Sequence, residues 1–349
     1  MSTKVQSIPK NRTEIPMAAL VAAIILSVIG VAAWIYQLVA GMQITELGQQ
    51  GVWGLYIAAF FAAVGAGAAL LFLRGLHEFT PLLAAESLNK SLLLALSAFV
   101  TGGLLITLDL GNPLAVWRML ISFETSSLMI WDFYLLIFAV LVTIAFWMAT
   151  RKGQKNPLLG LLSMLAAVIV VVVEAWMLAS MAARPFFAGG IMAVNFLVGA
   201  AVMGLSLALI AGIEKEKAAR WLVFALLAAL VLALSEAITG LLSVEERATV
   251  EARALLTGWA APLFWFQIVA GIMAPLVILR SKSLLWLAGL LAVFGVIAEK
   301  SWILAIGQSL PWMPQEAGAY LPNLLEIVAV VGIAGVGMLV YLLLKKFAQ

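Results

Sequence analysis

The sequence DLGNPLAVWRMLISFETSSLMIWDFY, residues 109–134, separates two long apolar runs and decides how the surrounding chain folds. It opens with two helix-stop signals, Gly111 and Pro113, and the three hydroxyl residues at 125–127 are typical helix N-caps. Between these signals, residues 114–123 alternate apolar side chains with one arginine, which suits a short helix lying at a membrane interface. The pattern predicts a helix that ends here, a short surface helix, and a second long helix.

The composition of the chain identifies its class. Of its 349 residues, 65% are hydrophobic and 11% are charged, and the mean hydropathy is +1.14. Soluble domains carry about 25% charged residues, so this chain has too few charges to cover a water-facing surface. A membrane barrel would show strands of about ten alternating residues, and the sequence has no such segments. The composition therefore predicts a polytopic helical membrane protein.

Ten apolar runs each approach the roughly 20 residues needed to cross a bilayer. The predicted fold is an all-α polytopic membrane protein of about ten transmembrane helices. A polar segment, 1–15, precedes a single transmembrane domain, 16–346. The predicted spans are 16–40, 52–76, 91–110, 127–149, 157–183, 188–213, 219–243, 256–280, 283–307 and 323–345.

Basic residues gather at alternate ends of these helices and predict their orientation. The side that holds both termini carries 15 of the 20 Lys and Arg residues. The other side carries only Arg118, Arg184, Arg247 and Arg253, while Lys300 falls inside a span. Because basic loops stay on the cytoplasmic side, we expect both termini to be cytoplasmic. The outer loops are short, so chemistry that needs a soluble domain is expected to belong to another subunit.

Weak internal similarity suggests a repeat of four helices. The fourth span carries the sequence WDF at 131–133 and the eighth carries FWFQ at 264–267. The fifth span places Glu174 in its interior and the ninth places Glu299 there. Two four-helix bundles flanked by the first and last helices would explain these matches, although apolar sequences also produce such matches by chance. The candidate repeats are 52–183 and 188–307.

The absence of cysteine and the presence of one histidine, His77, limit the cofactors. Without cysteine the chain cannot ligate an iron–sulfur cluster or form a disulfide. A single histidine cannot supply a bis-histidine haem site, and the 14 methionines are more typical of packing. We therefore expect neither haem nor an iron–sulfur cluster nor a metal site in this chain. Lipid and protein subunits are the expected partners, and nucleic acid is not.

Ionisable residues inside the predicted spans are candidates for function, because each costs about 2.5–3.5 kcal/mol at a helix centre. At 1.5 Å per residue, the acids lie in the outer half of the membrane or near its midplane. Structural pairing and proton handling are equally good interpretations of each acid, except that Glu326, near the surface, is expected to be structural. The proton-transfer candidates are Asp132, Glu174, Glu236 and Glu299, with His77 at the cytoplasmic end of the second span.

A second set of polar and aromatic residues lies near the outer ends of the second, third and fourth spans. Trp53 and Tyr56 are three residues apart and would share one face of a helix, although the aromatic belt of membrane interfaces is an alternative explanation. A phenol, a carboxylate and a cation around an apolar pocket could hold both oxygens of a quinol and accept its protons. The candidate quinone-binding residues are Trp53, Tyr56, Asp109, Arg118, Ser126 and Asp132.

Three segments resemble the NrfD/polysulfide reductase membrane-subunit family: WGLYIAAFFAAVGAGAALL at 53–71, LDLGNP at 108–113, and TSSLMIWDFYLL at 125–136. The resemblance implies a haem-free quinone/quinol site near the outer face of a prokaryotic inner membrane, with menaquinone as the expected quinone. It also implies a partner subunit with four iron–sulfur clusters and, through it, a molybdopterin-type catalytic subunit. The chain departs from some members in having no histidine near Trp53, which leaves the second headgroup ligand open.

Two functions from different classes remain in view at this point. The first is a membrane anchor that exchanges electrons between the quinone pool and the partner subunit, without a catalytic centre of its own; proton translocation could accompany this exchange. The second is an ion or solute transporter that uses the midspan carboxylates. Transporters usually carry helices broken near the midplane, whereas the prolines here lie mostly at span ends, with Pro275 as the exception.

Overall fold

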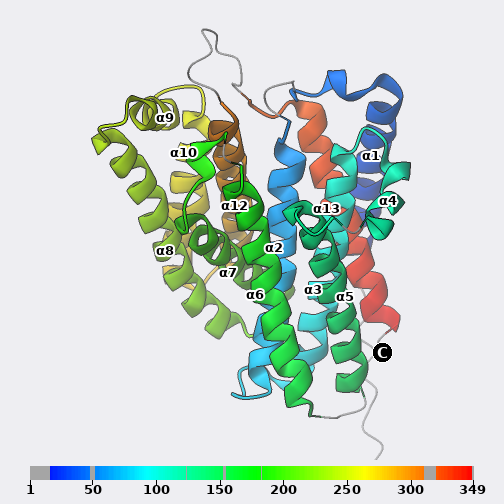
Figure 1. Ribbon diagram of the computed structural model, residues 1–349. Coiled ribbons are helices and arrows are strands. Elements are labelled where there is room, and N and C mark those ends of the chain that lie inside the picture. Colours follow the sequence, from blue (N-terminus) through cyan, green and yellow to red (C-terminus); the bar gives the residue numbers. More distant parts are fainter. Residues whose placement is uncertain are drawn as a thin grey trace, which may run out of the picture.

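The computed structural model describes residues 16–47, 52–122, 124–151, 155–181, 183–309 and 320–347. Over these residues the chain is helical and contains no strand, and ten helices are long and apolar enough to cross a membrane. The prediction of a ten-span all-α membrane protein is therefore confirmed (Figure 1). The predicted N-terminal segment, 1–15, lies outside the described residues.

The spanning helices follow the predicted order, and nine of them are regular α-helices. These are α1 (Met17–Ala40), α2 (Leu55–His77), α3 (Ala85–Asp109), α5 (Leu128–Arg151), α6 (Pro157–Ala179), α7 (Ile191–Ala211), α8 (Lys215–Leu242), α12 (Leu285–Gln308) and α13 (Leu324–Phe347). The eighth span is composite and consists of α10 (Ala261–Phe266), the π-helix η4 (Gln267–Met273) and α11 (Ala274–Ser281).

Short helices complete the connections. They are η1 (Met42–Ile44), η2 (Pro113–Ala115), α4 (Trp117–Ile121), η3 (Pro185–Phe187) and α9 (Glu246–Leu256). The predicted surface helix between the third and fourth spans is thus confirmed as η2 and α4. The phenol of Tyr134 donates to the carbonyl of Ser122 at 3.0 Å, which holds the end of α4 against α5.

Two elements differ from the sequence-based prediction. Helix α9 occupies a segment predicted to be a loop, and its amphipathic sequence includes an ion pair four residues apart, Arg247 to Glu251 at 2.8 Å. Helix α3 begins at Ala85 rather than at 91, because its polar first residues continue the helix although they add nothing to the apolar run. Both differences arise where a helix is polar, so hydropathy alone does not reveal it.

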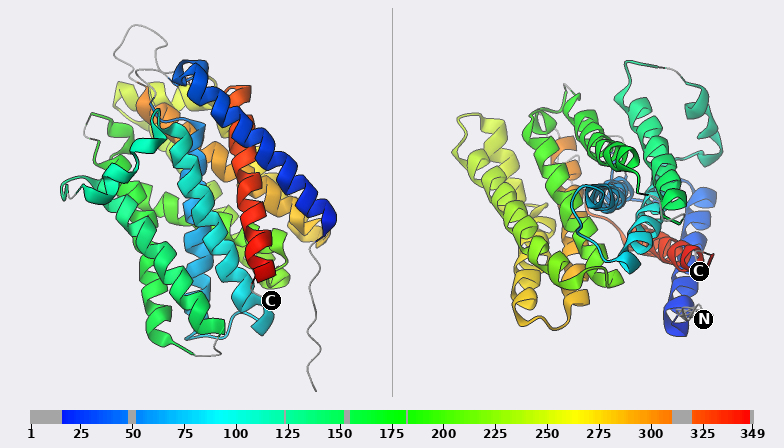
Figure 2. Two further views of the ribbon diagram at one scale, coloured as in Figure 1. Left: turned by 90° about the vertical axis from the view of Figure 1, so that its right-hand side faces the viewer. Right: turned by 90° about the horizontal axis from the view of Figure 1, so that it is seen from below.

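The helices form two groups of four and one outlying pair (Figure 2). The first group contains α2, α3, α5 and α6, and the second contains α7, α8, the composite span and α12. Corresponding helices make corresponding contacts, since α2 packs on α3 and α6 just as α7 packs on α8 and α12. Helix α2 also packs on α7 and joins the groups. The interpretation of 52–183 and 188–307 as sequence repeats stays a prediction.

Helices α1 and α13 form the outlying pair, which packs through α13 on α3 and α2 (Figure 2). The pair is close because a Cβ built on Gly332 would overlap the backbone of Gly30. Close approach through small residues is typical of helix pairs in membranes. The hydroxyl of Ser97 on α3 donates to the carbonyl of Gly337 at 2.5 Å, which fixes α13 against the first group.

The composite eighth span contains an unusual π-helical segment. Its first residue, Gln267, accepts a hydrogen bond from Nε1 of Trp302 on α12 at 2.7 Å. The same segment lies close to α12, because Gly271 faces Gly295 without room for a Cβ on either residue. Pro275 follows at the start of α11 and lacks the backbone N–H that a regular helix would use. π-Helical turns inside α-helices are frequent at functional sites.

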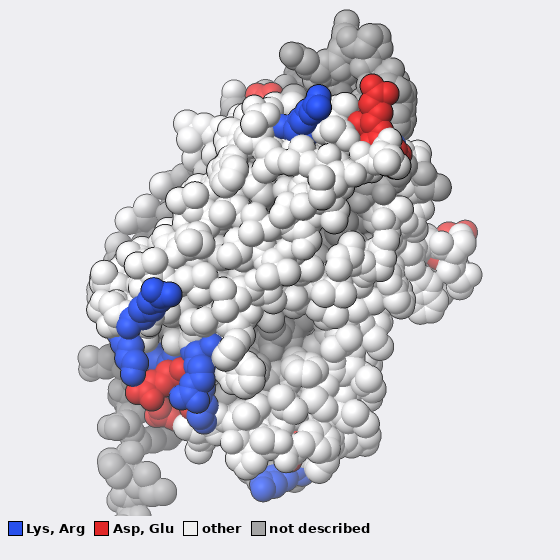
Figure 3. Space-filling model, turned by 90° about the vertical axis from the view of Figure 1, so that its left-hand side faces the viewer, with Lys and Arg blue, Asp and Glu red and all other residues white. Residues whose placement is uncertain are grey.

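Most charged side chains on the face shown in Figure 3 gather toward the two ends of the molecule, and few lie in the broad band between them. This distribution is required of a chain that spans a bilayer, because an exposed charge in hydrocarbon is costly. The start of α1 and the end of α13 lie at the same end of the molecule, the lower end in Figure 1. The opposite end, where α2, α5 and α7 begin and where α9 lies, is called the upper end below.

The close contact between α1 and α13 leads to a stability prediction. Gly332→Ala is expected to lower the free energy of unfolding by about 1–3 kcal/mol, because the added methyl group forces two backbones apart. The measurement is the thermal unfolding temperature of the purified protein in detergent. Gly103→Ala on α3 is the matched control, since no atom lies within 4 Å of its added Cβ. Equal unfolding temperatures for the two variants would contradict the prediction.

Candidate functional site

Two groups of buried polar residues lie toward the upper end of the helices. The first, here called the tyrosine cluster, consists of Gln37, Tyr56, Asp109, Tyr320 and Glu326 and joins α1, α2, α3 and α13. The second, here called the carboxylate row, consists of Asp132, Glu174, Asn195, Glu299 and Lys300 and joins α5, α6, α7 and α12. Every residue of the two groups except Asp109 and Asn195 is at least nine-tenths buried.

Tyr56 is held in place by a residue of the first span. Its phenol donates to the side-chain oxygen of Gln37 at 2.5 Å. The amide nitrogen of Gln37 in turn donates to the carbonyl of Leu108 near the end of α3 at 2.9 Å. Both side chains are fully buried. The orientation of Tyr56 is therefore fixed by a hydrogen-bond chain that crosses three helices.

Glu326 is the best-connected acid of the tyrosine cluster. One carboxylate oxygen accepts from the phenol of Tyr320 at 2.7 Å, and the other accepts from the backbone N–H of Asn323 at 2.9 Å. The same phenol accepts from the N–H of Leu55, the first residue of α2, at 2.7 Å. Burial and the nearby Glu326 carboxylate raise the pKa of Tyr320 well above its usual range, so this phenol stays protonated and donates.

Asp109 closes α3 with a carboxylate oxygen that is buried and has no hydrogen-bond partner among the described residues. Glu326 interacts electrostatically with both Asp109 and Tyr56, which places all three side chains in one region. A buried acceptor without a donor is costly. The phenol oxygen of Tyr56 and the unpaired oxygen of Asp109 thus offer acceptors that could bind the hydroxyl groups of a quinol ring.

Trp53 lies beside this cluster but not on the helix that carries Tyr56. Helix α2 begins at Leu55, so the prediction that Trp53 and Tyr56 share one helix face is wrong. A Cβ on Gly54 would overlap Tyr320, which indicates how closely the chain passes this ring before the helix starts. The backbone of Trp53 makes two hydrogen bonds with the side chain of Gln308 on α12, at 2.9 and 2.7 Å.

The carboxylate row is built around the ammonium group of Lys300. Its Nζ donates to the side-chain oxygen of Asn195 at 2.6 Å and lies 3.9 Å from Glu299 and 3.9 Å from the centre of the Phe196 ring. The amide nitrogen of Asn195 donates to the other oxygen of Glu299 at 2.7 Å. An amide, a carboxylate and an aromatic face therefore compensate one buried cation.

Glu174 extends the row from Lys300 toward α5. It interacts electrostatically with both Lys300 and Asp132. Neither carboxylate oxygen of Glu174 has a hydrogen-bond partner within the described part of the chain, and the same holds for one oxygen of Asp132. The structure thus brings together three of the predicted proton-transfer residues, Asp132, Glu174 and Glu299.

Glu236 lies at the far end of this row, on α8. It lines a small cavity of about 30 Å³ together with Asn195 and Trp302, and it interacts electrostatically with Glu251 on α9. Burial raises the pKa of Glu251, while its ion pair with Arg247 opposes that shift. A cavity of this size with the polar side chains of Asn195 and Glu236 in its wall can hold a water molecule. Acidic side chains are therefore found on successive helices from α5 to α9, which lies at the upper end of the molecule.

The amino-acid sequence matches a known family over most of its length. Residues 43–311, from just before α2 to just after α12, match the family model described as "Polysulphide reductase, NrfD". The chain belongs to the NrfD family. Both four-helix groups fall within the match, whereas α1 and α13 lie outside it. The tyrosine cluster therefore combines family residues on α2 and α3 with Gln37 and Glu326 from the flanking helices.

Two relatives cover nearly the whole chain. A putative membrane subunit of dimethyl sulfoxide reductase from Halobacterium salinarum is 25% identical over 90% of this chain and 87% of its own length. A selenate reductase subunit from Mesobacillus selenatarsenatis is 23% identical over 90% of each chain.

Three of the predicted site residues lie away from both groups. Arg118 is exposed on α4, with its guanidinium 6.0 Å from the Trp117 ring. Ser126 is exposed and its hydroxyl donates to Glu124 at 2.7 Å, which lowers the pKa of that carboxyl. His77 lies at the lower end, where its Nδ1 accepts from the backbone N–H groups of Leu82 and Leu83 at 3.1 and 3.0 Å. These bonds give His77 a role in holding the turn after α2.

Several residues of this NrfD site were not found from the sequence. Gln37, Asn195, Gln267, Gln308 and Tyr320 are neutral, so a search for charges within spans passes over them. A polar amide inside an apolar run was the available signal. Among the described residues, no group of three His, Cys, Asp or Glu side chains is placed to hold a metal ion.

The carboxylate row leads to a second stability prediction. Lys300→Met is expected to lower the free energy of unfolding by about 3–5 kcal/mol, because it leaves buried acids without their cation. The double variant Glu299→Gln/Lys300→Met is expected to recover much of the loss. Thermal unfolding in detergent measures both, with Lys282→Met, which removes an exposed lysine, as the control. A double variant no more stable than Lys300→Met would count against charge pairing.

Proposed function

We propose that this chain is the membrane anchor and quinone/quinol-oxidoreducing subunit of a respiratory complex. It would pass electrons between the quinone pool and an iron–sulfur partner subunit at the upper end. The observation that carries the proposal is the pair of carboxylates Asp109 and Asp132, each with a buried and unpaired oxygen among the described residues. They lie at the upper ends of α3 and α5, which pack against each other, and Tyr56 lies near Asp109.

The residues of the chain have distinct parts in this proposal. Gln37 accepts the hydrogen bond from the phenol of Tyr56 and orients it, so the phenol oxygen can accept from one hydroxyl group of a quinol ring. Asp109 and Asp132 supply acceptors for the hydroxyl protons. A bound quinol supplies two electrons and two protons. The protons and the electrons leave the site by separate routes, because an uncompensated charge is costly in an apolar site. Menaquinone is the quinone we expect, and the acceptor chemistry is the same for other quinones.

The upper end is the expected outer face, because the basic loops lie at the lower end. Arg118 is exposed at the periphery and is available for contact with a partner or lipid headgroups. Both relatives are named as subunits of reductases, of dimethyl sulfoxide and of selenate. By analogy, we infer an iron–sulfur subunit and, through it, a molybdopterin-type catalytic subunit as partners in a prokaryotic inner membrane. The catalytic subunit would determine the terminal substrate.

The carboxylate row provides a route for protons. Asp132 lies next to Glu174, which in turn lies near Lys300 and, through it, Glu299 and Asn195. The small cavity beside Asn195 is also lined by Glu236, and a second small cavity is lined by Glu236 and the buried Glu251 on α9. All these acids lie on the upper half of their helices, so the row favours proton exchange with the upper, outer side. Redox-driven translocation would need a further route through the lower half.

The transporter alternative requires broken helices in corresponding positions of both halves. The π-helical segment η4 and Pro275 interrupt the eighth span. Its counterpart in the first group, α5, is a continuous α-helix of 24 residues. One interrupted helix without a counterpart favours electron transfer over transport.

The proposed quinol site is tested by conservative substitutions in the assembled complex. Tyr56→Phe and Asp132→Asn are each expected to reduce quinol-linked electron transfer by about 100-fold, because each removes a group that binds an oxygen or accepts a proton. Activity of the catalytic subunit with an artificial electron donor should persist. The controls are Tyr36→Phe, on the exposed face of α1, and Glu124→Gln, in an exposed turn. Wild-type quinol turnover in both site variants would remove Tyr56 and Asp132 from the site.

The proton route is tested separately at Glu236. In Glu236→Gln the amide cannot carry a proton, so quinol turnover is expected to fall severalfold and its solvent deuterium isotope effect to rise. The measurement uses the complex in liposomes with a pH-sensitive dye outside. Glu246→Gln, which changes an exposed acid on α9, is the control. An unchanged isotope effect would show that protons leave by another path.

A further inference from the structure

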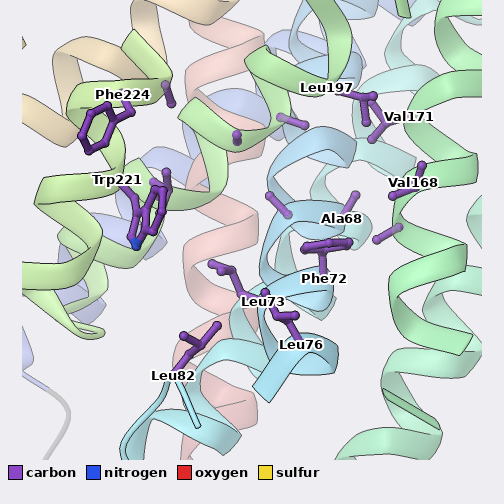
Figure 4. Close-up of a pocket in the computed structure, with 16 residues that line it drawn as sticks. Ala68, Phe72, Leu73, Leu76, Leu82, Val168, Val171, Leu197, Trp221 and Phe224 are labelled. Carbon is purple, nitrogen blue, oxygen red and sulfur yellow. The ribbon is translucent and has the colours of Figure 1, made fainter. Parts of the chain in front are cut away.

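An apolar groove opens between α6 and α8, and no residue of either polar cluster lines it. Its volume is about 500 Å³, within the range of about 300–1,000 Å³ typical of ligand sites. Helices α2 and α7 form its floor, with Ala68 and Ala201 among the lining residues. Figure 4 shows Phe72 and Leu76 of α2 facing this space, with Trp221 and Phe224 on α8 and Val168 on α6 at its sides.

The groove lies where the two four-helix groups meet. Elsewhere on the first group, α13 packs on α2 and α3 and covers part of them. The described chain supplies no helix between α6 and α8. An apolar surface of this kind inside a bilayer is covered by an apolar molecule, because it offers water no hydrogen-bond partners.

The size of the groove favours a hydrocarbon chain over a protein helix. A spanning helix is about 10 Å across and about 30 Å long, which corresponds to on the order of 2,000 Å³. This is several times the volume of the groove. A flexible acyl chain fits a space of this volume that is lined by aliphatic and aromatic side chains.

A cation stands at the lower rim of the groove. Nζ of Lys217 donates to the carbonyl of Leu82, which itself lines the groove, at 2.7 Å. It also lies 3.3 Å from Glu214, and its side chain remains 54% exposed. Glu214 is fixed in turn by the backbone N–H of Ala84 at 2.5 Å. Lys217 precedes Trp221 by four residues, so both side chains lie on one face of α8.

Further basic residues surround this position and outnumber the acids. The start of α8 carries Lys215, Lys217 and Arg220 against Glu214 and Glu216. The neighbouring connection between α11 and α12 adds Arg280 and Lys282. Figure 3 shows Lys and Arg side chains gathered at the lower end of this face, with acids between them. The net charge at the rim is positive.

We propose that this groove binds one anionic phospholipid, with an acyl chain between α6 and α8 and its phosphate at Lys217. The lipid would seal the boundary between the two helix groups at the side that α13 does not cover. The site lies at the opposite end from the proposed quinol pocket, and it does not depend on the proposed function. A quinone tail could fill the same apolar space, but a neutral headgroup would have no use for the cation at the rim.

The proposal is tested by native mass spectrometry of the complex released from mild detergent. Dipalmitoyl phosphatidylglycerol is added in competition with dipalmitoyl phosphatidylcholine and with menaquinone. We expect one phosphatidylglycerol to be retained in preference. Lys217→Gln is expected to reduce retention about fivefold, the usual effect of one cation facing an anionic lipid. Lys346→Gln removes an exposed charge at the same end, on α13, and should have no effect.

A second variant tests the groove itself. Ala201→Phe places a ring in the space and is expected to abolish retention, whereas Ala22→Phe, on the exposed face of α1, should not. Should Ala201→Phe fail to fold, Lys217→Gln and the lipid competition decide the matter. Equal retention of both phospholipids, preferential retention of menaquinone displaced by Ala201→Phe, or cross-linking of Trp221 to a membrane-spanning partner protein would each overturn the assignment.

Discussion

The structure depends on the compensation of one buried cation, Lys300. Lys300 is only 2% exposed and lies in the interior of a membrane protein, where an uncompensated charge is costly. Asn195 is bonded to both Lys300 and Glu299, so a single amide organises the pair. Because these residues lie on α7 and α12, while Glu174 lies on α6, the interaction fixes the second helix group and links it to the first.

Helix α2 has a matching role in the packing. It contacts members of both groups, and most of its residues are buried, including Tyr56 near its start. The tyrosine cluster lies on its side toward α1, α3 and α13, and the carboxylate row lies among α5, α6, α7 and α12. The family match covers α2 but neither α1 nor α13. Helices α1 and α13, which lie outside the family match, thus contribute to the surroundings of Tyr56, which lies inside it.

The spans could be predicted from sequence because hydropathy is a local property, and a run of about 20 apolar residues is explained by the bilayer alone. The polar helix α9 could not, because it has no apolar signature. The π-helical geometry of η4 could not either, because its apolar sequence suits a regular spanning helix equally well. The acids were identified individually from their cost in lipid. Their arrangement was not, since the pairing of Asn195 with Lys300 joins residues 105 positions apart and depends on how the spans pack.

Hydrogen bonding divides the buried acids into two kinds. Glu326 accepts from Tyr320 and from a backbone N–H, and Glu299 accepts from Asn195, so each has partners that a structural acid needs. Asp109, Asp132 and Glu174 each have at least one buried oxygen without a partner among the described residues. An unpaired buried acceptor costs about 1–3 kcal/mol of stability. Packing alone gives no reason for a residue with this cost at these positions. These three acids are therefore the ones whose cost is best explained by a proton or a ligand that arrives during function.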